Sequence, residues 1–478
     1  MTPTLPRTNS DSGAEGMHWV IAGLTLFAFA APSACVGCAF SVGTTGKYLA
    51  PALCCVVTLA SALGAIMIHK LTLKHPTCDT LPSLGLAVSG PTAKTLGLLV
   101  QQGNFLLYLP VAMLVSAQAL QSFIDPSLSL LSGCTDYWIF IVALLCLATT
   151  QLRSLSNVTI LSLISLVCVL ATILCVVLIV DDTPYDDKTE ALKVGNADMA
   201  WSASHESIKG WTQFALGISL TAWAYAPSFL TAELSNPNIM AKVEDFPKAI
   251  WLSAALNCAM FACTGLFVVN RWGATVNDPI MLGTAENFGL WDATALQARV
   301  CNFFWFFACI ISYALDSVPL GRACQRAWAP DVDVDDWSAG ACFKYLLATL
   351  PSFLFAVAAS IFVPSIFCML AIATALTVPW ANQVYPAYLY FSASRPSSTA
   401  TTSHQQPLLM PTTMHEIAAY DSKLQERMVE PAPFQVAYVG LLGFVMFLVC
   451  TAGAIGKLGI AELRGPSTVG CEGWMIIE

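Results

Sequence analysis

Long apolar windows separated by short polar segments run through most of this chain. A helix needs about 20 mainly apolar residues to cross a bilayer. Windows of this kind occur at 19–42, 48–68, 96–123, 137–152, 158–180, 211–232, 249–269, 298–320, 343–362, 364–391 and 434–454. The pattern therefore predicts an all-α polytopic membrane protein with about eleven transmembrane helices.

The polar segments divide the chain into four parts. Residues 1–16 form a polar tail, 17–391 hold the first ten windows, 392–433 are rich in Ser, Thr, Pro and Gln, and 434–478 hold the last window and a tail. We expect segment 392–433 to be a disordered cytoplasmic loop. Most of the 21 Lys and Arg residues lie on the cytoplasmic side if the amino terminus is inside. This bias predicts a cytoplasmic amino terminus and an outer carboxyl terminus.

One window is interrupted in its middle. Residues 210–257 contain an apolar helix broken at Pro227, a charged loop, and a second apolar helix after Pro247. A break frees backbone N–H and C=O groups, which are tolerated at membrane depth only where they face protein or a watery cavity. Transporters bind polar substrates with such groups. An ordinary proline kink gives the same pattern, so this segment alone leaves both interpretations open.

Composition supports the membrane class. Hydrophobic residues make up 56% of the chain and charged residues 11%, which lies outside the range of soluble domains. The net charge of -9 argues against a nucleic-acid partner. The apolar run 20–27 followed by Ala28-Phe29-Ala30 resembles a signal peptide. Apolar character continues past Ala30 and the leader has one basic residue, Arg7, so we expect an uncleaved first helix.

The cysteines do not point to metal or redox chemistry. Most of the 18 lie inside apolar windows, where cysteine behaves as a small hydrophobic residue. Cys35-Val-Gly-Cys38 is a lone CxxC without a second pair or a histidine cluster, which favours helix packing over a metal site. We therefore predict no metal site and infer no disulfide framework.

The residues around Pro227 resemble the sixth helix and following loop of the amino acid/auxin permease family, which belongs to the amino acid-polyamine-organocation superfamily. The resemblance rests on Thr231-Ala232-Glu233-Leu234, then Asn236-Pro237, and most specifically Asp245-Phe246-Pro247-Lys248-Ala249. Segments 89–104, 152–163 and 351–390 are similar to the start of the family's third helix, its link between helices four and five, and its helices nine and ten. The likeness covers residues 19–391.

The resemblance implies a secondary transporter with two inverted five-helix repeats, an eleventh helix, and a substrate site between broken helices one and six. It places the first break at 31–37, where Pro32-Ser33-Ala34 stands in place of the family's Gly-x-Gly. Pro32 still removes a backbone donor and Ala34 is still small, so we expect an unwound site. It also implies a multi-pass protein of the plasma membrane or the vacuolar or lysosomal membrane.

These two breaks supply the candidate substrate-binding residues. Backbone amides at the start of a half helix suit a carboxylate, which makes Ser33, Ala34 and Gly37 candidates for that part of an amino acid. Trp223 and Tyr225 are the expected side-chain walls of the pocket. Membrane aromatics away from a break more often serve in packing or as interface anchors, so the assignment depends on the break.

Coupling to an ion gradient requires suitable groups inside the membrane. Asp316 is the one carboxylate within a predicted window, which makes it the candidate proton site. Its place shortly before Pro319 and Arg322 is equally consistent with a hydrated or arginine-paired aspartate. Sodium would need several oxygen ligands, of which Ser312 could supply one. Residues 27–32 offer no polar side chain, so we place H+ ahead of Na+ and predict no other cofactor.

We therefore predict secondary active transport of amino acids by alternating access, coupled to protons. A sensor with a transporter fold and little flux, and a sodium-coupled amino acid transporter, remain open alternatives. An enzyme is disfavoured because the chain has no HExxH and no Gly-rich lysine loop. A channel is disfavoured because no filter-like or charge-ring element is found. The pattern does not select the amino acid or the direction of transport.

Overall fold

The computed structural model describes residues 16–124, 135–153, 155–182, 208–236, 239–272, 296–330, 332–333, 336–363, 366–394 and 433–463. The expected polar tail, apart from Gly16, lies outside these described residues, as do 395–432 of the expected cytoplasmic loop and the outer tail after Leu463. Within the described ranges the regular structure is helical, apart from one isolated bridge between Met17 and Met240.

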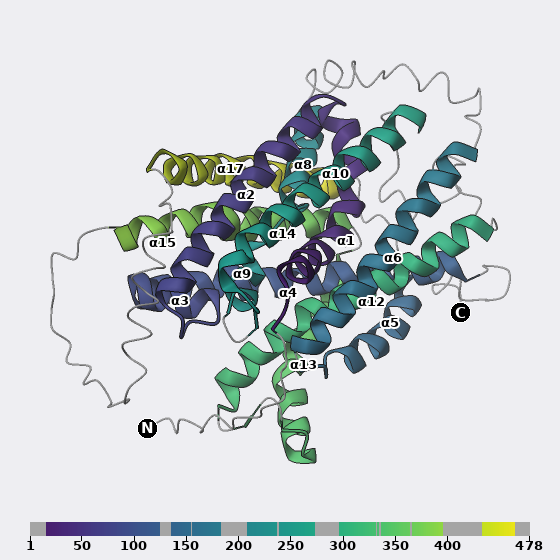
Figure 1. Ribbon diagram of the computed structural model, residues 1–478. Coiled ribbons are helices and arrows are strands. Elements are labelled where there is room, and N and C mark those ends of the chain that lie inside the picture. The colour runs from purple at the N-terminus through teal and green to yellow at the C-terminus, as the bar shows by residue number, and fades with distance from the viewer. Residues whose placement is uncertain are drawn as a thin grey trace, which may run out of the picture.

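Seven of the predicted windows correspond to single helices that are long and apolar enough to cross a membrane. These are α2 (Leu49–Lys74), α4 (Pro91–Phe123), α6 (Leu155–Asp182), α10 (Phe246–Trp272), α12 (Leu296–Trp328), α13 (Ala339–Phe362) and α17 (Pro433–Leu463). The short α3 (Leu81–Ser89) precedes α4, and η3 (Val243–Asp245) precedes α10. Together they form a bundle, with α17 packed against α8 and α14 (Figure 1).

The other four windows correspond to bent, short or interrupted helices. In α1 (Trp19–Thr45), the segments Trp19–Pro32 and Gly37–Thr45 meet at 67°, which makes this bent pair an eighth candidate span. The window 137–152 is the 15-residue α5 (Thr135–Thr149). The remaining two windows are each divided. One consists of α8 (Ile208–Trp223) and α9 (Ser228–Leu234), and the other of α14 (Ile366–Pro379), the π-helical η5 (Trp380–Val384) and α15 (Tyr385–Ser394).

The first five windows and the next five pack in the same way: contacts that a helix of windows one to five makes recur for its counterpart in windows six to ten. α1 packs on α10, and its counterpart α8–α9 packs on α2. In the same way α6 packs on α12 while α14 packs on α4, and α5 packs on α4 while α13 packs on α12. Because five is an odd number, the two sets cross the membrane in opposite directions. The helices thus form two inverted repeats, with α4 and α12 in mutual contact at the centre.

Glycines allow the interrupted helices to approach their neighbours closely. At Gly64 in α2, an added Cβ would collide with the backbone carbonyl oxygen of Asn382 in η5. At Gly217 in α8 it would meet Thr44 and Thr45 of α1. Small residues at such contacts are typical of membrane helix packing, where helices associate through close van der Waals contact.

We predict that Gly64→Ala destabilises the protein by about 1–3 kcal/mol, because the collision is with backbone that cannot rotate away. Gly340→Ala is the matched control, since a Cβ there meets nothing within 4 Å and the residue lies in the first turn of α13. Thermal unfolding of the purified variants measures both effects. An unchanged melting temperature for Gly64→Ala would contradict the packing described for α2 and η5.

Candidate functional site

A cavity lies where α1, α4, the α8–α9 break, α12 and α14 meet. About 320 Å³ of space between atoms lies there, part of it open to the surroundings. Its wall consists of residues from all five elements: Phe29, Ala30, Asn104, Tyr108, Trp223, Ala226, Asp316 and Val378. We call it the central cavity.

The break between α8 and α9 exposes backbone groups beside this cavity. Ala224 is the last residue to continue α8, and its N–H donates to the carbonyl of Leu220 at 3.1 Å. Pro227 has no N–H, and its carbonyl accepts the first backbone bonds of α9 from Leu230 and Thr231. The N–H of Ser228 at the start of α9 donates to the side-chain oxygen of Asn382 at 3.2 Å. A polar side chain from another helix therefore satisfies one of the freed amides.

Asn382 reaches this position because η5 is wound as a π-helix. Pro379 cannot donate a backbone hydrogen bond, and the chain continues as a π-helical turn from Trp380. The Asn382 amide nitrogen donates to the Val378 carbonyl at 3.0 Å, so the fully buried side chain connects η5 to α9 through both of its polar atoms. Sequence reasoning missed this residue, although a buried Asn between Pro379 and Pro386 in an apolar window is a usable signal.

Two stacked aromatic rings form one wall of the central cavity. Tyr108 of α4 and Trp223 at the end of α8 have ring centroids 5.4 Å apart and an interplanar angle of 24°. The Tyr108 hydroxyl lies 3.5 Å from the hydroxyl of Ser312 on α12. The indole N–H of Trp223 is buried and has no hydrogen-bond partner in the part of the chain that the structure describes. It is therefore a donor whose partner would have to come from outside the described residues.

Asp316 lies on the cavity wall and is only 2% exposed. α12 continues beyond it to Trp328, so Asp316 is inside the bundle and not at a hydrated helix end. Among the described residues, Asp316 has neither a hydrogen bond nor an ion pair. A carboxylate buried in this way needs a proton or a bound cation to offset its charge.

The other predicted site residues lie near the break but outside the lining of the central cavity. Ala34 is fully buried and packs with Ala224 and Phe261. A Cβ at Gly37 would meet Leu220 of α8 at 2.9 Å, which makes Gly37 a close-contact position. Ser33 lies in α1, but its side chain is outside the description.

Tyr225 faces α10. Its hydroxyl donates to the Ile250 carbonyl at 3.0 Å and lies 2.8 Å from the Ser253 hydroxyl.

The structure thus brings Trp223 and Asp316 together in the cavity, with Ser312 next to them through Tyr108. A binding role for each of these residues remains a prediction. Asn104 and Tyr108 were not selected from the sequence, because single polar residues in an apolar window do not reveal which helix face is internal.

Comparisons with known proteins gave a family match and similar solved structures. The profile of the family described as transmembrane amino acid transporter protein matches residues 15–415. One similar solved structure is the substrate-bound outward-open state of a Na+-coupled sialic acid symporter, with 13% identity over 93% of this chain and 91% of that chain and a TM-score of 0.50. Another is Mhp1, a nucleobase-cation-symport-1 family transporter in a closed conformation with bromovinylhydantoin bound, with 11% identity over 96% and 95% and a TM-score of 0.48. A search of curated proteins found no match.

We predict that Tyr225→Phe costs about 1 kcal/mol of stability, because it removes the buried hydrogen bonds to Ile250 and Ser253. The KM for a transported amino acid should stay unchanged, since this hydroxyl is directed to α10. Melting temperature and uptake kinetics of the same preparation measure the two effects separately. A raised KM with unchanged stability would place Tyr225 in the substrate site instead.

Proposed function

This chain belongs to the transmembrane amino acid transporter family, and from that premise we propose that it carries amino acids across a membrane by proton-coupled alternating access. It is a multi-pass membrane protein of a transporter family and not an enzyme. Its fold is shared with a symporter of known structure. The observation that carries the proposal is the central cavity, where an interrupted helix, an aromatic wall and a carboxylate with no partner among the described residues meet.

The cavity chemistry suits a zwitterion with a neutral side chain. The carboxyl oxygens of Asp316 offer acceptors for the substrate ammonium group, and the indole N–H of Trp223 offers a donor for the carboxylate. The remaining wall is largely apolar, with Phe29, Ala30 and Val378 available to a neutral side chain. Ser33, Ala34 and Gly37 lie within the continuous, bent α1, so their predicted backbone donors would require α1 to open at the bend.

Asp316 is the proposed coupling group. When it holds a proton, the carboxyl is uncharged and can stay buried, and its other oxygen can still accept a hydrogen bond from the substrate ammonium group, so the proton and the substrate are carried in the same direction. Ser312 lies next to this site through Tyr108 and would be the nearest predicted oxygen ligand if sodium were the coupling ion. Proton coupling is preferred because it needs only this one group.

The orientation belongs to the same proposal. With the amino terminus in the cytoplasm, the turn between α2 and α3, the start of α4 and the end of α12 lie on the cytoplasmic face. The plasma membrane and the vacuolar or lysosomal membrane both suit this arrangement. The expected cytoplasmic loop 392–433 would then connect α15 to α17 on that face.

We predict that Asp316→Asn lowers proton-driven uptake by about tenfold or more, because the variant cannot exchange a proton. The purified protein is reconstituted in liposomes and given labelled amino acids under an inward proton gradient and, separately, a sodium gradient. Asp136→Asn is the matched control, since Asp136 lies in the first turn of α5, outside the central cavity.

Wild-type uptake driven by the proton gradient, and lost only in Asp316→Asn, supports the proposal. Uptake driven by sodium and reduced by Ser312→Ala would replace proton coupling with sodium coupling. Binding of amino acids without flux under either gradient would indicate a sensor and contradict transport.

The charge of the cavity predicts selectivity. Aspartate and glutamate should be taken up about tenfold or more slowly than neutral amino acids of similar size, because their second carboxylate would face Asp316 without a compensating cation. Initial uptake rates across a panel of labelled amino acids measure this. Equal rates for glutamate and glutamine would contradict the assigned place of the substrate beside Asp316.

A further inference from the structure

A second cavity lies between α9, α12 and the turn that joins α2 to α3. It holds about 660 Å³ of space between atoms, part of it open to the surroundings, and its lining includes Asp79, Gln102, Glu233, Arg322 and Arg326. We call it the charged cavity. Its lining contains two carboxylates and two guanidinium groups, so it can compensate both charges of a zwitterion.

The same three elements, α12, the sixth window and α4, contribute residues to both cavities. α12 contributes Asp316 to the central cavity and, further along, Arg322 and Arg326 to the charged one. The sixth window contributes Ala226 to the first and Glu233 to the second, while α4 contributes Asn104 and Gln102, respectively. The two spaces therefore follow one another along the same three elements.

Two buried aromatic rings connect residues of the two linings, and we take them as the barrier between the cavities. Phe105 of α4 and Phe229 of α9 are fully buried, with ring centroids 6.0 Å apart. Phe105 also lies in edge contact with Phe29 of the central cavity, at 6.5 Å. The side-chain amide of Gln101 donates to the backbone carbonyl of Phe229 at 2.7 Å, which ties α4 to α9 beside these rings. Rotation of these two rings is a local change compared with a rearrangement of the bundle.

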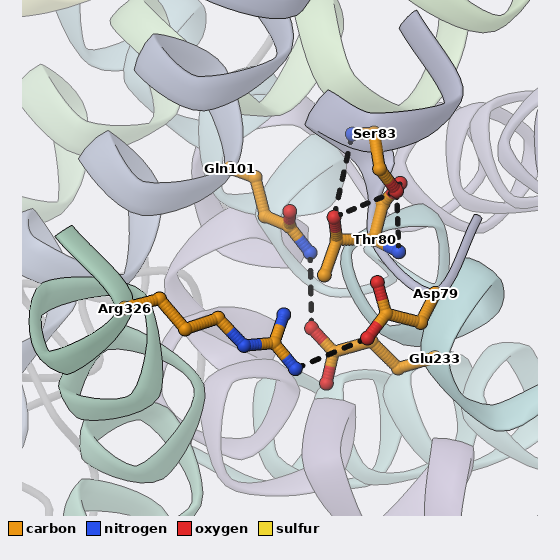
Figure 2. Close-up of polar contacts among 6 residues, drawn as sticks. All are labelled: Asp79, Thr80, Ser83, Gln101, Glu233 and Arg326. Atoms are coloured by element: carbon orange, nitrogen blue, oxygen red, sulfur yellow. Dashed lines mark hydrogen bonds and ion pairs between the residues drawn. The ribbon is translucent and has the colours of Figure 1, made fainter. Parts of the chain in front are cut away.

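Glu233 lies at the inner end of the charged cavity and is 9% exposed. The Gln101 amide donates to one of its carboxylate oxygens at 3.5 Å, as Figure 2 shows. The charged groups that act on Glu233 are Arg322, Asp79 and Arg326. A long single hydrogen bond leaves acceptor capacity on this carboxylate for a further donor.

The lining of the charged cavity also includes an ion pair. Arg326 donates to Asp79 at 3.1 Å, and both side chains are about half exposed (Figure 2). Asp79 is held in place because the next residue, Thr80, caps α3 through reciprocal hydrogen bonds with Ser83. Exposed pairs of this kind contribute little to stability, so this one can open at low cost.

The cavity also contains polar atoms without partners. The Nε of Arg322 and the side-chain oxygen of Gln102 are buried and have no hydrogen-bond partner among the described residues. Buried donors and acceptors of this kind cost free energy unless something binds them. An ammonium group can donate to Gln102 and Glu233, and a carboxylate can accept from Arg322.

We propose that the charged cavity is a second amino acid site, a transit site that binds the carboxylate at Arg322 and the ammonium group at Glu233 after the substrate passes the Phe105–Phe229 barrier. This inference rests on the proposed function, since it assigns a second stop on the route of the same substrate. The site recognises the zwitterionic head group and leaves the side chain in the open part of the cavity.

Alanine is the probe, because it carries the head group with a minimal side chain. A ligand that binds the folded state raises the melting temperature, and independent sites contribute additively. We compare the alanine-dependent shift in the wild type, Asp316→Asn, Arg322→Gln, Glu233→Gln and the Asp316→Asn/Arg322→Gln double variant. Lys94→Gln is the matched control, because it removes an exposed cation at the start of α4, outside the charged cavity.

The expected result is that Arg322→Gln and Glu233→Gln each weaken alanine binding at the charged cavity about tenfold or more, while binding at the central cavity remains. The rise in melting temperature due to the charged cavity persists in Asp316→Asn and disappears in the double variant. Lys94→Gln shows the same alanine-dependent rise as the wild type. Propionate and ethylamine, which each carry one of the two charges, should stabilise less than alanine. Arg322→Lys, which keeps the charge, should retain part of the alanine binding at the charged cavity if Arg322→Gln folds poorly.

The proposal fails if Arg322→Gln and Glu233→Gln keep the wild-type shift, including the case in which alanine produces none. It also fails if propionate stabilises as well as alanine, which would indicate a simple anion site. Failure of the proposed function is a separate observation, because it is judged from uptake in liposomes and not from these shifts.

Discussion

The need to satisfy backbone polar groups at interruptions of apolar helices governs this structure. Lipid offers no hydrogen-bond partner, so interruptions must face protein or a cavity. The bend in α1, the α8–α9 break and the π-helical η5 between α14 and α15 therefore belong in the interior. In the bond from the Ser228 N–H to Asn382, a side chain of η5 accepts from a backbone amide at the α8–α9 break. The central cavity lies where they converge.

The repeat symmetry explains which other elements enclose that cavity. α1 and α8–α9 are counterparts, as are α4 and α12, and each pair is in contact. These elements line the central cavity, and α4, α9 and α12 continue into the charged cavity. The buried rings of Phe105 and Phe229 contact each other, and Phe105 also contacts Phe29 of the central cavity. One set of helices thus lines both cavities.

The windows and the Pro227 break could be predicted because hydrophobicity and proline act locally along the chain. The place of Asp316 could not, since an apolar window does not reveal which helix face is internal. Asn104, Tyr108 and Asn382 were missed for the same reason. Glu233 was missed because the sixth window was ended at residue 232, whereas α9 continues to Leu234. Tyr225 was selected from the sequence as a wall of the pocket, but its hydroxyl faces α10, whereas Trp223, two residues before it, lines the cavity.

The central claim is that the substrate binds beside Trp223 and Asp316 at the break in the sixth window. An experimental structure with a transported amino acid bound tests this most directly. We predict density for the amino acid in the central cavity, with its ammonium group at the Asp316 carboxylate and its carboxylate near the Trp223 indole N–H. Density for the amino acid elsewhere in the bundle, with this cavity empty at saturating concentration, would contradict the account.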